Sequence, residues 1–161
     1  MSSDCSVKID DGILNIRVGA IIMKNGQFLM VGNDKDKYLY SVGGRIKFGE
    51  TAEEAVIREV FEETGHKLEI DRLGFVHENF FHAKYDKNTE DKKMFYEISL
   101  YFYMKTPKDF EPICKSVTEL GSKEKLVWVS PKTDFTIYPE FFKTELTNPS
   151  ESVKHFVTDD R

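Results

Sequence analysis

The chain has 161 residues, 40% of them hydrophobic and 32% charged, and its formal net charge at pH 7 is −5. This length and composition predict one globular domain that spans residues 1–161 and folds without disulfides or a structural metal. The acidic balance argues against a protein that grips polymeric nucleic acid, but it permits a small nucleotide whose charge is covered by divalent cations.

The two cysteines, Cys5 and Cys114, lie far apart and are not in metal-binding spacing. This argues against a secreted disulfide scaffold or a zinc site. No stretch approaches the roughly 20 apolar residues of a membrane helix, and the first ten residues, MSSDCSVKID, lack the features of a signal peptide. We therefore expect a cytoplasmic protein without membrane association.

The N-terminal half of the domain begins with predicted strands. Residues 16–23 (IRVGAIIM) are apolar and rich in β-branched types, as in a buried strand. Lys24-Asn25-Gly26 is a turn signal, and residues 27–31 form the expected partner strand of a hairpin. A further short strand is expected at residues 38–42, before two glycines.

A helix is predicted over residues 51–64. Thr51 is the expected N-cap, Glu54 stands three residues later as in a capping box, and Gly65 occupies the C-terminal stop position.

The remaining segments alternate between strands and loops. We expect one long strand or a bent pair at residues 68–81, an exposed loop at 84–93, strands at 97–104 and 126–129, a helix at 139–146, and a polar, loosely held tail from 148 to 161. Strands outnumber helices and the two helices are separated, which indicates an α+β class with a core at about 16–147.

Three glutamates within the predicted helix are candidates for metal binding. Glu59, Glu62 and Glu63 stand at positions i, i+3 and i+4, so their carboxylates share one helix face. Such carboxylates repel one another unless a cation lies among them. Because the cluster contains only oxygen ligands, it suits Mg²⁺ or Mn²⁺ rather than zinc. The alternative is an ordinary solvated helix face.

Neighbouring residues can support this cluster. Arg58 lies one turn before Glu62 and can hold that carboxylate, or Glu50, through a bidentate pair. Glycines at positions 43, 44 and 49 permit a sharp approach to the helix and bring backbone carbonyls near the carboxylates.

The spacing resembles the Nudix box, G-x5-E-x7-R-E-U-x-E-E-x-G-U, in which U is apolar. The matching residues are Gly44, Glu50, Arg58, Glu59, Val60, Glu62, Glu63 and Gly65. One position departs from the pattern, because His66 stands where the family has an apolar residue. That departure puts local packing in doubt and leaves every charged position in place. The surroundings are also similar to the family, over about residues 18–146.

The resemblance implies the Nudix fold, a mixed β-sheet sandwiched between α-helices. It also implies a Mg²⁺- or Mn²⁺-dependent hydrolase of a nucleoside diphosphate linked to another moiety. By position, Glu59, Glu62 and Glu63 would be metal ligands, and the Gly43 carbonyl is a further candidate. Arg58 and Glu50 would orient the cluster through an ion pair.

The general base stays open at this point, because the family uses different carboxylates for it. Within the box the candidates are Glu59 and Glu62. Outside it they are Glu97, at the start of a predicted strand, and Glu124, in a loop. By default, either outside residue is an ordinary surface carboxylate.

Candidate substrate-binding residues lie in the segment His77-Glu78-Asn79-Phe80-Phe81-His82. Strand alternation sends His77, Asn79 and Phe81 to one face, where they can stack on a base and hydrogen-bond to it. The alternative for the phenylalanines is packing beneath a helix.

The polar loop at 84–93 can cover an extended substrate, which favours a nucleoside-diphosphate sugar or ADP-ribose. Modified nucleoside triphosphates are the alternative substrates. A non-catalytic nucleotide-binding Nudix regulatory module is less favoured, because every box glutamate is kept and no DNA-binding segment is attached. The oligomeric state, monomer or homodimer, stays open.

Overall fold

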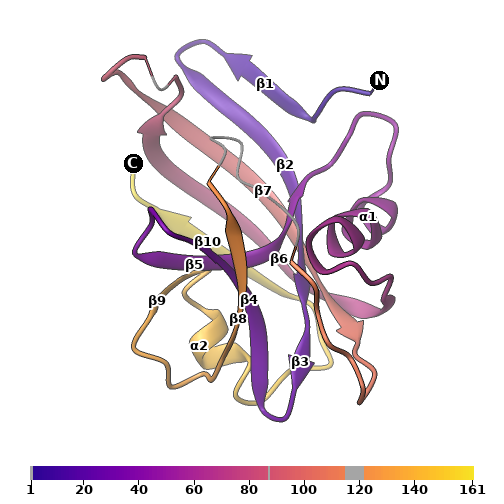
Figure 1. Cartoon of the computed structure of the whole chain (residues 1–161). Coiled ribbons are helices and arrows are strands. Elements are labelled where there is room, and N and C mark those ends of the chain that lie inside the picture. The colour runs from indigo at the N-terminus through magenta and orange to yellow at the C-terminus, as the bar shows by residue number, and fades with distance from the viewer. Residues whose placement is uncertain (1, 87, 115–121) are drawn as a thin grey trace.

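Figure 1 shows a computed structural model of the protein, which describes residues 2–86, 88–114 and 122–161. Its elements are β1 (Ser6–Ile9), β2 (Gly12–Ile21), β3 (Met23–Lys24), β4 (Gln27–Asn33), β5 (Tyr38–Arg45), α1 (Ala52–Thr64), β6 (Glu69–Lys84), β7 (Lys92–Lys105), β8 (Glu124–Val129), β9 (Thr136–Tyr138), α2 (Phe142–Glu145) and β10 (Lys154–Asp159). Among the described residues, no helix is long and apolar enough to cross a membrane.

The strands form one mixed sheet. Its main path is β10-β6-β7-β2-β5-β4-β3, while β1 pairs with β2, β8 with β4 and β9 with β5. The central strand β2 pairs in parallel with β7 along one edge. Its other edge is shared by β1 and β5, both antiparallel.

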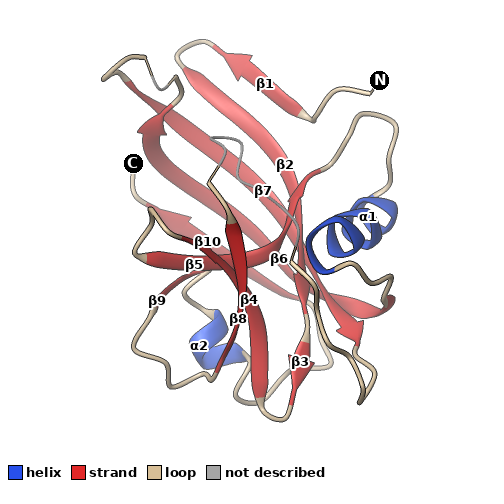
Figure 2. Cartoon of the chain, viewed as in Figure 1, coloured by secondary structure: helices blue, strands red, loops and turns tan. Residues whose placement is uncertain are grey.

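The two helices cover opposite faces of this sheet (Figure 2). Alternate residues of β2 point to opposite sides. Val18 and Ala20 pack with Val56 and Val60 of α1, whereas Ile21 belongs to a second core that contains Phe142 of α2. The layers are therefore helix, sheet and helix, as predicted, although α2 is much shorter than α1.

The local predictions around α1 are confirmed. Thr51 Oγ1 accepts a hydrogen bond from the Glu54 N–H, and the Glu54 carboxylate accepts one from the Thr51 N–H, which completes the capping box. Gly65 ends the helix in the left-handed region at φ +75°. The hairpin turn at Asn25 and Gly26 also forms, with both residues at positive φ.

The connection between β6 and β7 is shorter than expected. Loop 84–93 was predicted, but β6 continues to Lys84 and β7 begins at Lys92. Stacked cross-strand pairs, Phe80 with Tyr96 and Phe81 with Phe95, extend the ladder outward into this charged segment. The predicted helix at 139–146 is likewise reduced to the single turn of α2.

The prediction of a loosely held tail is wrong. β10 pairs in parallel with β6 over six residues. The Phe156 ring stacks on Phe141 at 4.3 Å between centroids, and His77 Nε2 lies 2.9 Å from Thr158 Oγ1. The segment is polar in composition, but one aromatic side chain and a backbone ladder hold it on the sheet.

Candidate functional site

Two consecutive glycines at the end of β5 make room for the carboxylates of α1. Gly43 has φ +145°, and a Cβ there would lie 2.1 Å from the Val18 carbonyl oxygen. The Gly43 N–H donates to Glu63 Oε2 at 3.0 Å. A Cβ on Gly44 would lie 2.6 Å from the Glu59 carboxyl carbon. Glu59 and Glu63 therefore lie directly against backbone that only glycine can provide.

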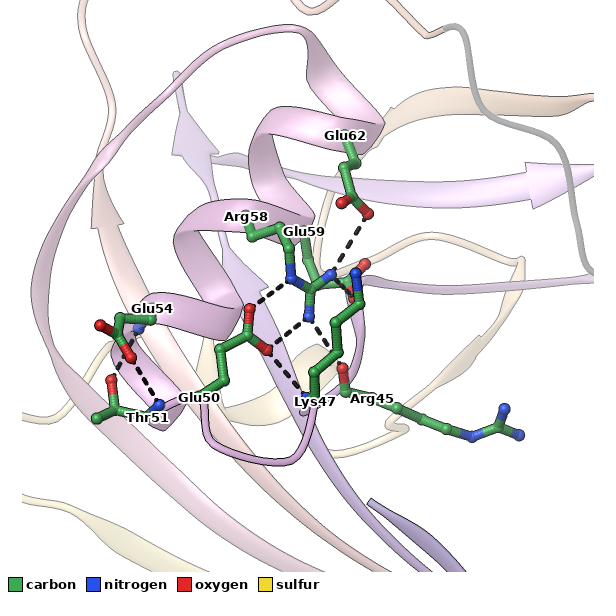
Figure 3. Close-up of polar contacts among 8 residues, drawn as sticks. All are labelled: Arg45, Lys47, Glu50, Thr51, Glu54, Arg58, Glu59 and Glu62. Atoms are coloured by element: carbon green, nitrogen blue, oxygen red, sulfur yellow. Dashed lines mark hydrogen bonds and ion pairs between the residues drawn. The ribbon is translucent and has the colours of Figure 1, made fainter. Parts of the chain in front are cut away.

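Arg58 ties the box carboxylates together, as Figure 3 shows. It donates to both oxygens of Glu50, from Nε at 2.6 Å and from the second guanidinium nitrogen at 2.9 Å. It also donates to Glu59 Oε1 at 2.6 Å, to the Arg45 carbonyl at 3.1 Å and, more weakly, to Glu62 Oε2 at 3.4 Å. Of the two bidentate partners considered from the sequence, Glu62 and Glu50, the structure shows Glu50.

The carboxylates differ in their electrostatic environments. The hydrogen bonds from Arg58 lower the pKa of Glu50 to about 2. Burial raises the pKa of Glu59, and burial holds the pKa of Glu63 well above its ordinary value. Glu62 is half exposed. Glu59 and Glu63 are thus desolvated carboxylates, and at Glu59 the effect of burial outweighs that of the hydrogen bond from Arg58.

The donor set fits a hard cation in its chemistry. Every candidate side chain offers oxygen, which is what Mg²⁺ and Mn²⁺ prefer. Within the residues that the structure describes, however, no three acidic, histidine or cysteine side chains converge closely enough to form a metal cage. Arg58 occupies the space between Glu59 and Glu62 instead. The three-glutamate ligand set therefore stays a prediction.

Glu124 lies at the site, at the start of β8. Its Oε1 accepts a hydrogen bond from the Tyr40 hydroxyl at 2.7 Å, and its charge contributes to the raised pKa of Glu63. Burial and this carboxylate raise the pKa of Tyr40. Tyr40 was missed in the sequence analysis, because the contact depends on how β5 and β8 flank β4.

Glu97 lies on β7 and is held by two neighbours on β2. Its Oε1 accepts a hydrogen bond from Asn15 Nδ2 at 2.9 Å and lies 3.6 Å from an Arg17 guanidinium nitrogen. Asn15 is fully buried. Neither Asn15 nor Arg17 was predicted, because a single polar residue in an apolar strand carries no signal of its partner.

The predicted substrate residues share a sheet face with this group. His77 pairs with Ser99, Asn79 with Glu97, and Phe81 with Phe95, and directly paired residues point to the same side. His77 is buried against Tyr101 and Phe141, and burial lowers its pKa to about 4. Its contacts are those of a structural side chain, whereas Asn79 and Phe81 remain partly exposed.

The sequence match decides the family. A model described as the NUDIX domain matches residues 14–136. The chain belongs to the Nudix family. The matched range contains α1, Glu97, Glu124 and all of β2 except its first two residues. It confirms the resemblance of the box and the class of pyrophosphohydrolase that the box implies. Comparison with curated proteins gives no match.

Solved structures resemble the whole Nudix domain. A UDP-X diphosphatase superposes with a TM-score of 0.58 at 13% identity, over 88% of this chain and 66% of that chain. A mutator MutT protein from Bacillus halodurans superposes with a TM-score of 0.57 at 18% identity, over 91% of this chain and 93% of that chain. An ADP-ribose pyrophosphatase from Streptococcus suis superposes with a TM-score of 0.56 at 15% identity, over 89% of this chain and 98% of that chain. At these identities the likeness shows the fold alone, which is the predicted Nudix fold.

The one departure from the Nudix box has a structural explanation. His66 packs edge-on against Phe110 at 5.3 Å between ring centroids, and its Nε2 lies 2.8 Å from the Glu111 carbonyl oxygen. The Ile113 N–H donates to the Thr64 carbonyl at 2.8 Å. His66 therefore packs as an apolar residue would, and it also helps to hold residues 110–113 over the C-terminal end of α1.

Proposed function

We propose that this Nudix domain hydrolyses a diphosphate linkage in a nucleoside diphosphate joined to another moiety, using Mg²⁺ or Mn²⁺. The observation that carries the proposal is the placement of two desolvated carboxylates, Glu59 and Glu63, against the Gly43–Gly44 backbone. Buried carboxylates with raised pKa values are typical of sites that receive a cation.

Glu59, Glu62 and Glu63 would hold the metal, and the Gly43 carbonyl is a further candidate ligand. A bound divalent cation neutralises phosphate oxygens and lowers the pKa of the attacking water. Arg58 stays cationic and keeps Glu50 and Glu59 in place through charge-assisted hydrogen bonds. Glu62 is the ligand with the most freedom to move, because it is half exposed and its contact with Arg58 is long.

We assign the general base to Glu124 among the four open candidates. Glu59 and Glu62 both face Arg58, and Glu97 faces Arg17. Among the residues that the structure describes, the Glu124 carboxylate instead accepts a hydrogen bond from the neutral hydroxyl of Tyr40, and it lies within electrostatic reach of Glu63. A general base must be free to accept a proton, and among the described residues no cation pairs with the Glu124 carboxylate.

For the substrate we favour a nucleoside-diphosphate sugar or ADP-ribose. Two superposed structures carry the names UDP-X diphosphatase and ADP-ribose pyrophosphatase. Asn79 and Phe81 lie on the sheet face that continues beyond Glu97, so an extended substrate would run along it. Modified nucleoside triphosphates remain the alternative, since a mutator MutT protein superposes equally well.

The test is product release from a panel of nucleoside-diphosphate sugars, ADP-ribose and nucleoside triphosphates, with Mg²⁺, with Mn²⁺ and with chelator. We expect metal-dependent formation of a nucleoside monophosphate from one member of the first two classes. Turnover that survives the chelator would contradict the metal role. Nucleotide binding without turnover across the panel would instead favour a regulatory module.

A further inference from the structure

A second arginine, Arg17 on β2, lies within electrostatic reach of the box carboxylates Glu59 and Glu63. It pairs with Arg45 of β5, next to the pair formed by Val18 and Gly44, and Gly44 is the residue against which Glu59 lies. The positive charge of Arg17 lowers the pKa of both Glu59 and Glu63, although burial outweighs it. Arg17 therefore belongs to the same electrostatic site, although it lies outside the box.

Arg17 and Arg58 differ in how many of their guanidinium N–H donors make hydrogen bonds or ion pairs within the described structure. Arg58 makes five hydrogen bonds to carboxylate and carbonyl oxygens and is 20% exposed. Within the described part of the chain Arg17 makes one ion pair, with Glu97 at 3.6 Å, and its side chain is 33% exposed. A guanidinium carries five N–H donors in a fixed fork, so Arg17 retains donors for a ligand.

A buried network fixes the position of Arg17. Glu97, 14% exposed, offers its Oε1 to Arg17 and accepts Asn15 Nδ2 at the same oxygen. Asn15 is fully buried, and among the described residues its Oδ1 has no hydrogen-bond partner. An orphaned polar atom in the interior costs stability. We therefore infer that this network serves to position Arg17 at the site and not to stabilise the fold.

We propose that Arg17 binds a non-bridging oxygen of the substrate diphosphate and that Glu97 is its positioning residue rather than the general base. The proposal deepens the function proposed above and rests on it. A diphosphate places several charged oxygens close together, and a planar guanidinium recognises adjacent phosphate oxygens bidentately. Arg17 is suited to this because its charge reaches Glu59 and Glu63, while its ion pair with Glu97 leaves most of its N–H donors for a ligand.

The test is calorimetric binding of imidodiphosphate, a non-hydrolysable diphosphate, in the presence of Mg²⁺. We expect Arg17→Ala to weaken binding by about 10- to 100-fold, the loss typical of a hydrogen bond to a charged group. Arg17→Lys should recover part of it. Arg161→Ala, which removes an exposed arginine at the far end of β10, is the matched control and should bind like wild type.

Glu97→Gln separates positioning from base catalysis. We expect it to raise KM several-fold, to leave the pH profile of kcat unchanged and to be non-additive with Arg17→Ala. Unchanged imidodiphosphate binding in Arg17→Ala, or no binding in wild type, overturns the role of Arg17. If Glu97→Gln flattens the pH profile of kcat, the positioning role of Glu97 is overturned. If the wild-type protein binds imidodiphosphate but hydrolyses no substrate, only the proposed hydrolase activity is contradicted, and the binding role of Arg17 stands.

Discussion

Among single residues, Arg58 has the largest influence on the site, because its side chain holds three carboxylates in one arrangement. The carboxylate it leaves most free is Glu62, which is half exposed. We expect Glu62→Gln to reduce kcat by at least 100-fold while the melting temperature stays within about 2 °C, because the residue is a proposed ligand with little packing. Glu53→Gln, on the exposed first turn of α1, is the control. Equal activity in the two variants would remove Glu62 from its role.

Glu124 gives the second residue-level prediction. Glu124→Gln keeps the shape of the side chain and a group near Tyr40 but cannot accept a proton. We expect kcat to fall by about 100- to 10,000-fold, the range typical of general-base catalysis. Tyr40→Phe, which removes the hydroxyl partner of Glu124, should retain most activity. A loss in Glu124→Gln that raises only KM would contradict the assignment.

Glu50 gives a prediction about stability in acid. Its pKa is about 2 in the folded protein, below the ordinary value of 4.5. The unfolded chain therefore binds more protons at acidic pH, so the contribution of Glu50 to stability is complete above about pH 4.5 and is lost as the pH falls towards 2. Urea unfolding of wild type and Glu50→Gln should show a difference that narrows over this window. A constant difference would mean that packing, not charge, stabilises Glu50.

At the scale of elements, β10 is the part of the fold that depends most on distant partners. Phe156 is half-buried and stacks on Phe141, whereas the neighbouring Val157 points to solvent and is 55% exposed. We expect Phe156→Ala to lower the free energy of unfolding by about 2 kcal/mol and Val157→Ala to change it by less than about 0.5 kcal/mol. Equal effects in urea titrations would show that β10 is held by its backbone alone.

The elements also show why some predictions succeed. The signals of α1 are local, since its cap, stop and apolar stripe lie within fifteen residues of Thr51. The charged positions of the site were recognisable for the same reason. β10 could not be predicted, because its stability comes from a parallel partner strand and from Phe141. The contacts of Arg17 exist only once β2 has paired with β7, and those of Tyr40 only once β5 and β8 have both paired with β4, so neither residue could be predicted from the sequence.

At the scale of the whole molecule, the proposed metal site links ligand binding to folding. A ligand that binds only the folded state stabilises it by about 2.7 kcal/mol at a concentration 100 times its dissociation constant. We expect Mn²⁺ at such a concentration to raise the melting temperature by roughly 5–10 °C, and to have no such effect on a variant with both Glu59 and Glu63 changed to Gln. The same rise in both proteins would place the cation elsewhere.

The parallel pairing of β2 with β7 also governs how the chain reaches this structure. Asn15 and Glu97 are 82 positions apart, so their contact closes a long loop before it gains any stabilising interaction. Folds dominated by such contacts form on the order of milliseconds to seconds, whereas a helix such as α1 forms within microseconds. After dilution from denaturant, helical signal should therefore return first. Diphosphate binding should return later, once β2, which carries Arg17, has paired with β7, which carries Glu97.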